Sequence, residues 1–176
     1  LSESICHQCH FETDGSALVR GRRREDFRPG LRWTDFVVNY SREQAGGRMT
    51  VTGHVEQMHQ SRCYQQSATL TCLTCHDPHA LPKPDERAAY YRSVCLECHG
   101  DDACGVAAQV RSEKNQNDCA ACHMPQAATD IVHVAFTHHR IGIHLDQPPP
   151  PHDEEPPVLA PVLDVSHLDK ADRERT

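Results

Sequence analysis

Aromatic residues are scarce in this chain, and long hydrophobic runs are missing. Phenylalanine, tryptophan and tyrosine make up 5% of the 176 residues, and the mean hydropathy is −0.65. A polypeptide this polar, with 12 prolines, buries little apolar area of its own, so we expect another component to fill part of the interior. The missing hydrophobic runs also argue against a transmembrane helix within this sequence.

Positive charge is also in short supply. The formal net charge is −7, which argues against nucleic acid as the main partner. The first residues, LSES, lack the charged start and apolar run of a signal peptide. The last ones, from Lys170 to Thr176, stop inside a polar pattern typical of the start of a helix. We therefore expect the sequence to be either a mature chain or a piece of a longer one, and we favour the latter.

Cysteine and histidine, in contrast, are abundant, with 10 and 14 residues. Four segments share the pattern Cys-x-x-Cys-His, namely CHQCH at 6–10, CLTCH at 72–76, CLECH at 95–99 and CAACH at 119–123. This pattern is the attachment signature of c-type haem. Cysteines three residues apart lie on one side of a helical turn, where they can form thioethers with two vinyl groups, and the next histidine binds the iron. The predicted attachment cysteines are Cys6, Cys9, Cys72, Cys75, Cys95, Cys98, Cys119 and Cys122, and the predicted proximal ligands are His10, His76, His99 and His123.

Zinc is the main alternative for these cysteines. The pairs at 72–75 and 95–98 have nearly the spacing of a zinc ribbon. A ribbon, however, does not need a histidine after every second cysteine, and four such histidines would occur by chance in roughly 4 of 100,000 cases at this composition. A pure disulfide framework explains the histidines even less well. We therefore predict four covalently bound c-type haems, which would also supply the missing apolar interior.

A low-spin haem needs a second axial ligand, usually histidine or methionine. His79 lies three residues past His76, and Pro78 stiffens the connection, so its side chain could be aimed at a neighbouring iron. Two further candidates, His133 and His139, follow the last attachment motif, and His54 ends a predicted strand. The alternative for each is a surface histidine or one that hydrogen-bonds a haem propionate. The preferred distal ligands are His54, His79, His133 and His139, the other histidines of the pool are His59, His138 and His144, and the reserves are Met49, Met58 and Met124.

Two cysteines, Cys63 and Cys104, lie outside the motifs. Haem attachment implies assembly outside the cytoplasm, where disulfides persist. A disulfide between Cys63 and Cys104 is the preferred prediction. Free buried thiols, or Cys63 as an unusual haem ligand, are the alternatives. The same reasoning predicts an extracytoplasmic location, whether periplasmic, on the outer surface or extracellular.

The expected fold class is mainly irregular, with short α-helices packed around stacked haems and one small β-hairpin. Residues 31–40 and 48–56 are rich in β-branched and aromatic side chains and flank a Gly-Gly turn signal, which predicts the hairpin. Helices are predicted at 55–66 and 85–99.

Three segments are expected along the chain. Residues 1–145 would form a tetrahaem cytochrome domain, 146–161 a Pro-rich acidic linker, and 162–176 the start of a helical segment. A run of arginines from Arg20 to Arg24, with Arg28, interrupts the acidic balance. It would either balance the charge of haem propionates or form a solvated loop.

Two runs of sequence resemble known cytochromes. The run VEQMHQSRCYQQSATLTCLTCHDPH resembles the segment before the CHxPH site in bacterial multihaem cytochromes of the doubled-CxxCH and pentahaem nitrite-reductase-like group, where Ser-x-His or Ser-x-Met often precedes that haem; here the position is Cys63. The run CAACHMPQAATDIVHVAFTHHRIGIH resembles a segment of multihaem cytochromes fused to tetratricopeptide repeats. The resemblance covers about residues 1–145, implies further haem motifs upstream and helical repeats downstream, and favours His133 and His139 as functional positions.

The sequence favours electron transfer over catalysis. Histidines outnumber the predicted irons, so most haems are expected to be bis-His and closed to substrate, and no Cys-x-x-Cys-Lys active-site motif is present. The expected partners are redox proteins or further copies of the chain, the latter in a filament. One alternative is a multihaem oxidoreductase acting on a small nitrogen or sulfur compound at a five-coordinate haem. Another is an interaction module whose haems are structural.

Overall fold

The computed structural model describes residues 3–11, 13–42, 53–128, 135–144 and 158–173. They fall into two compact units. The first comprises residues 1–57 and 146–176 and is called here the sheet unit. The second, residues 58–145, holds three of the four Cys-x-x-Cys-His motifs and is called the three-motif unit. None of the described helices has the length and hydrophobicity needed to cross a bilayer.

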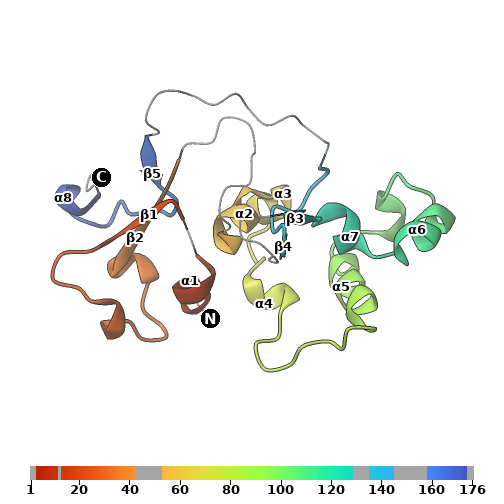
Figure 1. The fold of residues 1–176 in the computed structure, drawn as a ribbon, viewed down its shortest axis with the longest axis horizontal. Helices are drawn as coiled ribbons and strands as arrows, with labels where there is room; N and C mark the ends of the chain where they lie inside the picture. Colours follow the sequence, from red (N-terminus) through yellow and green to blue (C-terminus); the bar gives the residue numbers. More distant parts are fainter. Residues whose placement is uncertain (1–2, 12, 43–52, 129–134, 145–157, 174–176) are drawn as a thin grey trace. The chain divides into compact units, whose positions relative to one another are not determined.

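A three-stranded antiparallel sheet organises the sheet unit (Figure 1). Strand β2 (Val37–Arg42) lies between β1 (Gly15–Leu18) and β5 (Leu159–Pro161). Successive residues of β2 are buried, because side chains on both faces of the strand are covered by the rest of the unit.

The predicted β-hairpin of residues 31–40 and 48–56 is wrong where the structure describes its second strand, from residue 53 on. Strand β2 pairs with β1 and β5 instead, and residues 43–52 lie outside the described part of the chain. Helix α2 (His54–Gln60) begins where the predicted strand was to end. Its residues Val55 and Met58 are three apart and both buried, which is the spacing of one helix face.

The scarce aromatic residues are concentrated in the core of the sheet unit. Phe27 packs edge-on against Trp33 and Phe36, with ring centroids 5.5 and 5.7 Å apart. Such edge-to-face contacts are favourable beyond the area they bury. The first core cluster is Phe11, Phe27, Trp33, Phe36, Val37 and Val55, and the second is Val19, Val38, Tyr40 and Val165.

Residues 158–173 belong to this core. Besides β5, they include helix α8 (Lys170–Arg173). The Tyr40 hydroxyl donates to the Asp172 carbonyl oxygen at 3.4 Å, and Arg20 Nε lies 3.5 Å from Asp172 Oδ1. One unit does end at 145, as predicted, but residues 1–57 group with the residues after 145 and not with 58–145, because the end of the predicted linker supplies a strand and the segment after it packs on the sheet.

We expect Trp33→Phe to destabilise the sheet unit. The buried Trp33 Nε1–H donates to Asn39 Oδ1 at 2.9 Å, and Asn39 Nδ2 donates to the Phe11 carbonyl oxygen at 3.2 Å. Losing the indole donor leaves a buried amide oxygen unpaired, which costs about 1–3 kcal/mol. Hydrogen–deuterium exchange of the β2 amides should accelerate. Arg23→Ala is the control, because the Arg23–Glu25 ion pair is exposed and contributes little to stability; equal exchange in both variants would contradict this account of the core.

Short helices make up most of the three-motif unit (Figure 1). Helix α5 packs against α4 and α7, and β3 pairs with β4 in a small antiparallel sheet. The elements are α3 (Arg62–Gln66), α4 (Cys72–Cys75), α5 (Arg87–Leu96), α6 (Ala108–Asn115), α7 (Cys119–His123), β3 (Gln126–Ala128) and β4 (Ala135–Thr137).

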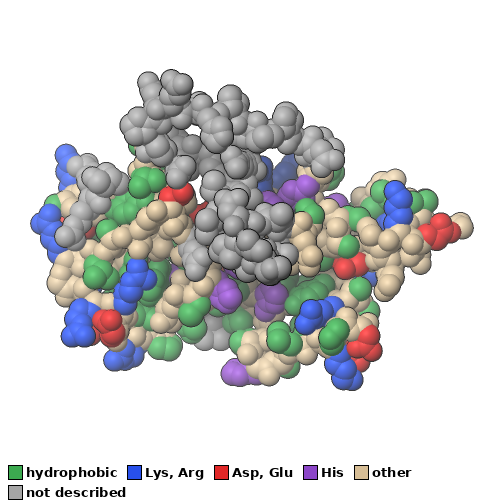
Figure 2. All heavy atoms as spheres, in the orientation of Figure 1, with side chains coloured by type: hydrophobic (Ala, Val, Ile, Leu, Met, Phe, Trp, Pro, Cys, Tyr) green, Lys and Arg blue, Asp and Glu red, His purple; other side chains and the backbone are tan. Residues whose placement is uncertain are grey.

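The polypeptide gives this unit little hydrophobic core. Of the hydrophobic side chains described in this unit, Met58 is buried and the others are exposed or partly exposed. Large apolar side chains lie at the surface instead, with Leu81 79% and Ile143 82% exposed. Figure 2 shows hydrophobic side chains at the surface among charged ones. The shortage of core expected from the composition is thus concentrated in the unit that carries three motifs.

Candidate haem-binding sites

Each of the four motifs lies on a helix or at its end. The first is in α1 (Ser4–His10), and the others are in α4, at the end of α5 and in α7. Backbone hydrogen bonds hold these turns: His76 N–H donates to Cys72 O, and His99 N–H to Cys95 O, both at 3.0 Å. Within one turn the two cysteines face the same side, which is the arrangement needed to bind both vinyl groups of one porphyrin.

Thiols of different motifs lie close together in the three-motif unit. Burial, with the neighbouring thiols of Cys119 and Cys75, raises the pKa of Cys95 to about 11. Burial also raises the pKa of Cys75. These thiols are therefore protonated at neutral pH.

In the part of the chain that the structure describes, no three or more His, Cys, Asp or Glu side chains are placed to hold a metal ion, so a zinc-ribbon ligand set is not assembled there.

His10 and His54 face each other in the sheet unit. Their ring centroids are 5.2 Å apart, with ring planes at 86°. Two imidazoles on opposite sides of one iron have centroids about 6 Å apart, because each metal–nitrogen bond is about 2 Å. His54 is the first residue of α2 rather than the end of a strand. The predicted distal ligand His54 thus lies beside His10 of the first motif, but it is held there by a helix and not by the predicted strand.

A second histidine pair, His76 and His139, occurs in the three-motif unit. Their ring centroids are 6.2 Å apart, which matches the spacing of two axial imidazoles. The Tyr91 hydroxyl is 3.3 Å from His76 Nδ1. His139 Nδ1 is 2.9 Å from the Thr137 carbonyl oxygen. Because a carbonyl only accepts, the proton of a neutral His139 is on Nδ1, and Nε2 carries the lone pair that a metal would need.

The neighbouring histidines, His138 and His144, have the opposite tautomer. His138 Nδ1 accepts from the Arg140 backbone N–H at 3.1 Å, and His144 Nε2 donates to the Arg140 carbonyl oxygen at 2.9 Å. Burial, with His144 and Arg140 nearby, lowers the pKa of His138 to about 4, so its ring is neutral at neutral pH. Each neutral ring then carries its proton on Nε2, which makes both less suited than His139 to bind iron through that atom.

The two remaining attachment histidines have different neighbours. His123 Nδ1 donates to the Gly142 carbonyl oxygen at 3.0 Å, which leaves the lone pair on Nε2. His99 Nε2 lies 3.9 Å from Cys63 Sγ. Cys63 and Cys104 are both free thiols, so the preferred disulfide is not formed in the structure. From the sequence, a haem ligand was only an alternative role for Cys63, because no local pattern relates residue 63 to residue 99.

Three other candidate distal ligands, His79, His133 and His59, differ in what the structure describes of them. His79 is exposed in a turn, where its backbone N–H donates to Asp77 Oδ1 at 2.8 Å. Among the described residues, it makes no ring contact with an attachment histidine. His133 lies outside the described residues. His59 stacks on Tyr64 with ring centroids 4.0 Å apart.

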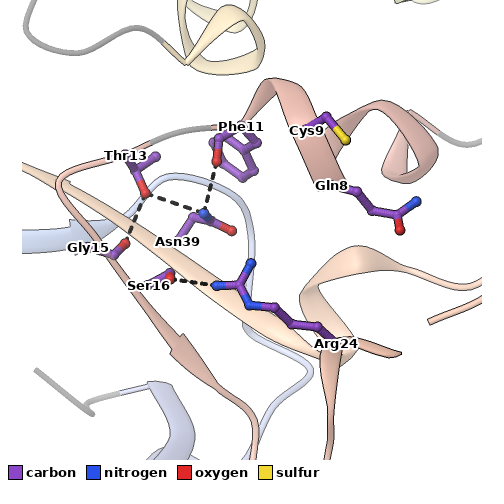
Figure 3. Close-up of a pocket in the computed structure, with 8 residues that line it drawn as sticks. All are labelled: Gln8, Cys9, Phe11, Thr13, Gly15, Ser16, Arg24 and Asn39. Atoms are coloured by element: carbon purple, nitrogen blue, oxygen red, sulfur yellow. Dashed lines mark hydrogen bonds between the residues drawn. The ribbon is translucent and has the colours of Figure 1, made fainter. Parts of the chain in front are cut away.

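A pocket of about 380 Å³ lies beside the first motif in the sheet unit (Figure 3). Its lining includes Cys9 of the motif, Asn39 of β2 and Arg24 from the arginine run. The Arg24 guanidinium donates to Ser16 Oγ at 2.8 Å and lies over the Trp33 ring. One cation of the arginine run is thereby held in the wall of the pocket that Cys9 also lines, where it can pair with a carboxylate.

Comparison with known proteins gives one match. Residues 66–103 match the family model described as the doubled CXXCH motif. The matched segment contains the motifs at 72–76 and 95–99. No curated protein and no solved structure matches the chain. The doubled motif, which binds c-type haem covalently and is typical of electron carriers, supports the interpretation of this chain as a multihaem c-type cytochrome.

Proposed function

We propose that the chain binds four c-type haems and passes electrons among them. The observation that carries the proposal is the pairing of attachment histidines with second histidines, at His10–His54 and His76–His139. An iron held between two histidines has no open position for a substrate, and it can still accept and donate an electron. Covalent attachment fixes the haems in place, which suits transfer between near neighbours.

The residues of the three-motif unit fit such a cofactor. Its exposed apolar side chains and scarce buried ones suit contact with large apolar discs. Tyr91 and the Gly142 carbonyl orient His76 and His123 by hydrogen bonds to Nδ1. In the sheet unit, Arg24 would neutralise a propionate of the haem attached at Cys6 and Cys9. The haem itself would supply a one-electron redox centre.

The proposal extends to the setting of the chain. C-type haem is attached outside the cytoplasm, so the chain would act in an extracytoplasmic or extracellular electron-transfer chain. Its partners would be redox proteins or further copies of itself, the latter as subunits of a filament. The resemblance of residues 119–144 to cytochromes with tetratricopeptide repeats suggests that helical repeats follow it in a longer protein, related to the pentahaem nitrite-reductase-like group.

One observation favours a second candidate, an oxidoreductase acting on a small nitrogen or sulfur compound. Among the described residues, no second histidine or thiol is placed against His123 as His54 is against His10. A haem on His123 is therefore the position at which substrate could reach the iron. Carbon monoxide would bind the reduced haem there if the distal position were open.

Stopped-flow reduction combined with turnover assays tests the proposed function. We expect a small reductant to reduce all four haems quickly, with negligible turnover of nitrite, hydroxylamine or sulfite and no spectral change with carbon monoxide. Reduction of only some of the haems would contradict conduction through all four. Substantial turnover of one substrate, lost when carbon monoxide occupies a single haem, would instead establish the oxidoreductase.

A further inference from the structure

The thiol of Cys63 lies against the attachment histidine of the third motif. Cys63 Sγ is 3.9 Å from His99 Nε2. An iron between a histidine nitrogen and a cysteine sulfur separates the two atoms by about 4.3 Å, from metal–ligand bonds of about 2.0 and 2.3 Å. The observed distance is thus close to that of two axial ligands of one metal. Cys63 thus faces the histidine of its motif as His54 faces His10 and as His139 faces His76, with a sulfur in place of the second imidazole.

We propose that Cys63 is the distal axial ligand of the haem attached at Cys95 and Cys98, opposite His99. The inference rests on the proposed binding of haem at that motif. It assigns Cys63 a function that the attachment pattern does not contain, and it makes this haem chemically different from the bis-His haems of the same chain.

Local structure holds the Cys63 thiol in place. Cys63 is in the first turn of α3, whose N-cap residue, Ser61, is buried. Ser61 Oγ accepts from the Tyr64 N–H at 3.3 Å and donates to the Met58 carbonyl oxygen at 2.6 Å. A capped helix start of this kind fixes the direction of the side chains in its first turn. His99 is held from the other side by its backbone bond to Cys95 at 3.0 Å.

The chemistry of Cys63 differs from that of the attachment cysteines. The sulfur of an attachment cysteine becomes a thioether, whereas Cys63 is outside the Cys-x-x-Cys-His motifs and keeps its thiol. The Cys63 thiol would bind ferric iron as a thiolate: it would lose its proton to solvent and its sulfur would share an electron pair with the iron, with no change of oxidation state. A thiolate pushes electron density onto the iron. This haem would therefore have a lower reduction potential than the bis-His haems.

The test is the magnetic circular dichroism and EPR of the oxidised, fully loaded protein and its variants. We expect a low-spin histidine–thiolate signal from one haem beside the bis-His signals. Cys63→Ser should abolish that signal and raise the potential of one haem, while Cys63→Met should restore a low-spin, higher-potential haem without the thiolate signal. The matched control is Cys104→Ser, which removes the other non-motif cysteine and should leave every signal unchanged.

Two outcomes would overturn the assignment. One is a spectrum that Cys63→Ser leaves unchanged, and the other is a Cys63–Cys104 disulfide found by peptide mapping without reductant. Either result, with haem masses still present on the denatured protein, would reject Cys63 as ligand while leaving haem binding intact. Loss of haem mass at the peptide of residues 95–99 in the unmodified protein would reject haem binding at this motif and the ligand with it.

Discussion

Replacing Cys95 and Cys98 together by alanine should remove one haem and loosen the three-motif unit. Both cysteines belong to the motif at the end of α5, which packs against α4 and α7. Burying one large apolar side chain contributes about 1.5–3 kcal/mol, and a porphyrin covers the area of several such side chains. Among the described residues of this unit, Met58 is the one buried hydrophobic side chain. Little other buried apolar area is therefore left to stabilise the unit once the haem is lost.

The haem number of this variant is read from its intact mass after denaturation, and its compactness from limited proteolysis. We expect three haem masses instead of four, with faster cleavage within residues 58–145 and little change in the sheet unit, which has aromatic clusters of its own. Cys104→Ala is the control, since this cysteine is outside the motifs, and it should retain four haems. A double variant that keeps the full haem mass would show that these cysteines do not attach haem.

His139→Ala should convert one haem from low spin to high spin, while His138→Ala should not. The two neighbours differ in hydrogen bonding: His139 Nδ1 donates to the Thr137 carbonyl, whereas His138 Nδ1 accepts from the Arg140 N–H. Only the first arrangement leaves the lone pair on Nε2, and only His139 lies at axial-ligand spacing from His76.

EPR at low temperature distinguishes the two variants. His139→Ala should show a high-spin signal from one haem while the protein still carries the full haem mass, because the cysteines and His76 are intact. His138→Ala serves as the matched control, and its spectrum should be that of the unmodified protein. If the high-spin signal arose in His138→Ala and not in His139→Ala, the tautomer argument would be wrong.

The helical placement of the Cys-x-x-Cys-His motifs could be predicted from sequence because it is local. Cys-x-x-Cys-His fits within one helical turn, so five letters define both the cysteine side and the histidine. The structure places all four motifs on helices or at their ends. His54 and His139 were also among the preferred ligands, and both lie beside attachment histidines.

Features that depend on distant contacts could not be predicted. Strand β2 was recognised from its β-branched residues, but its partner β5 lies more than a hundred residues away and follows a Pro-rich stretch that reads as linker. The start of helix α2 was taken for the end of a strand, since β-branched residues such as Val55 suit either element until packing selects one. His79 was preferred because it follows a motif closely, yet the structure leaves it exposed in a turn.

The central claim is that four haems are covalently bound, and intact mass spectrometry of the denatured chain tests it most directly. The protein would be produced in a host that attaches c-type haem, then unfolded in acid and chelator to remove any group that is not covalently held. The account predicts a mass equal to the polypeptide plus four haems, with one haem on each peptide that contains residues 6–10, 72–76, 95–99 or 119–123. A mass equal to the polypeptide alone, or zinc in the native protein that the chelator removes, would contradict it.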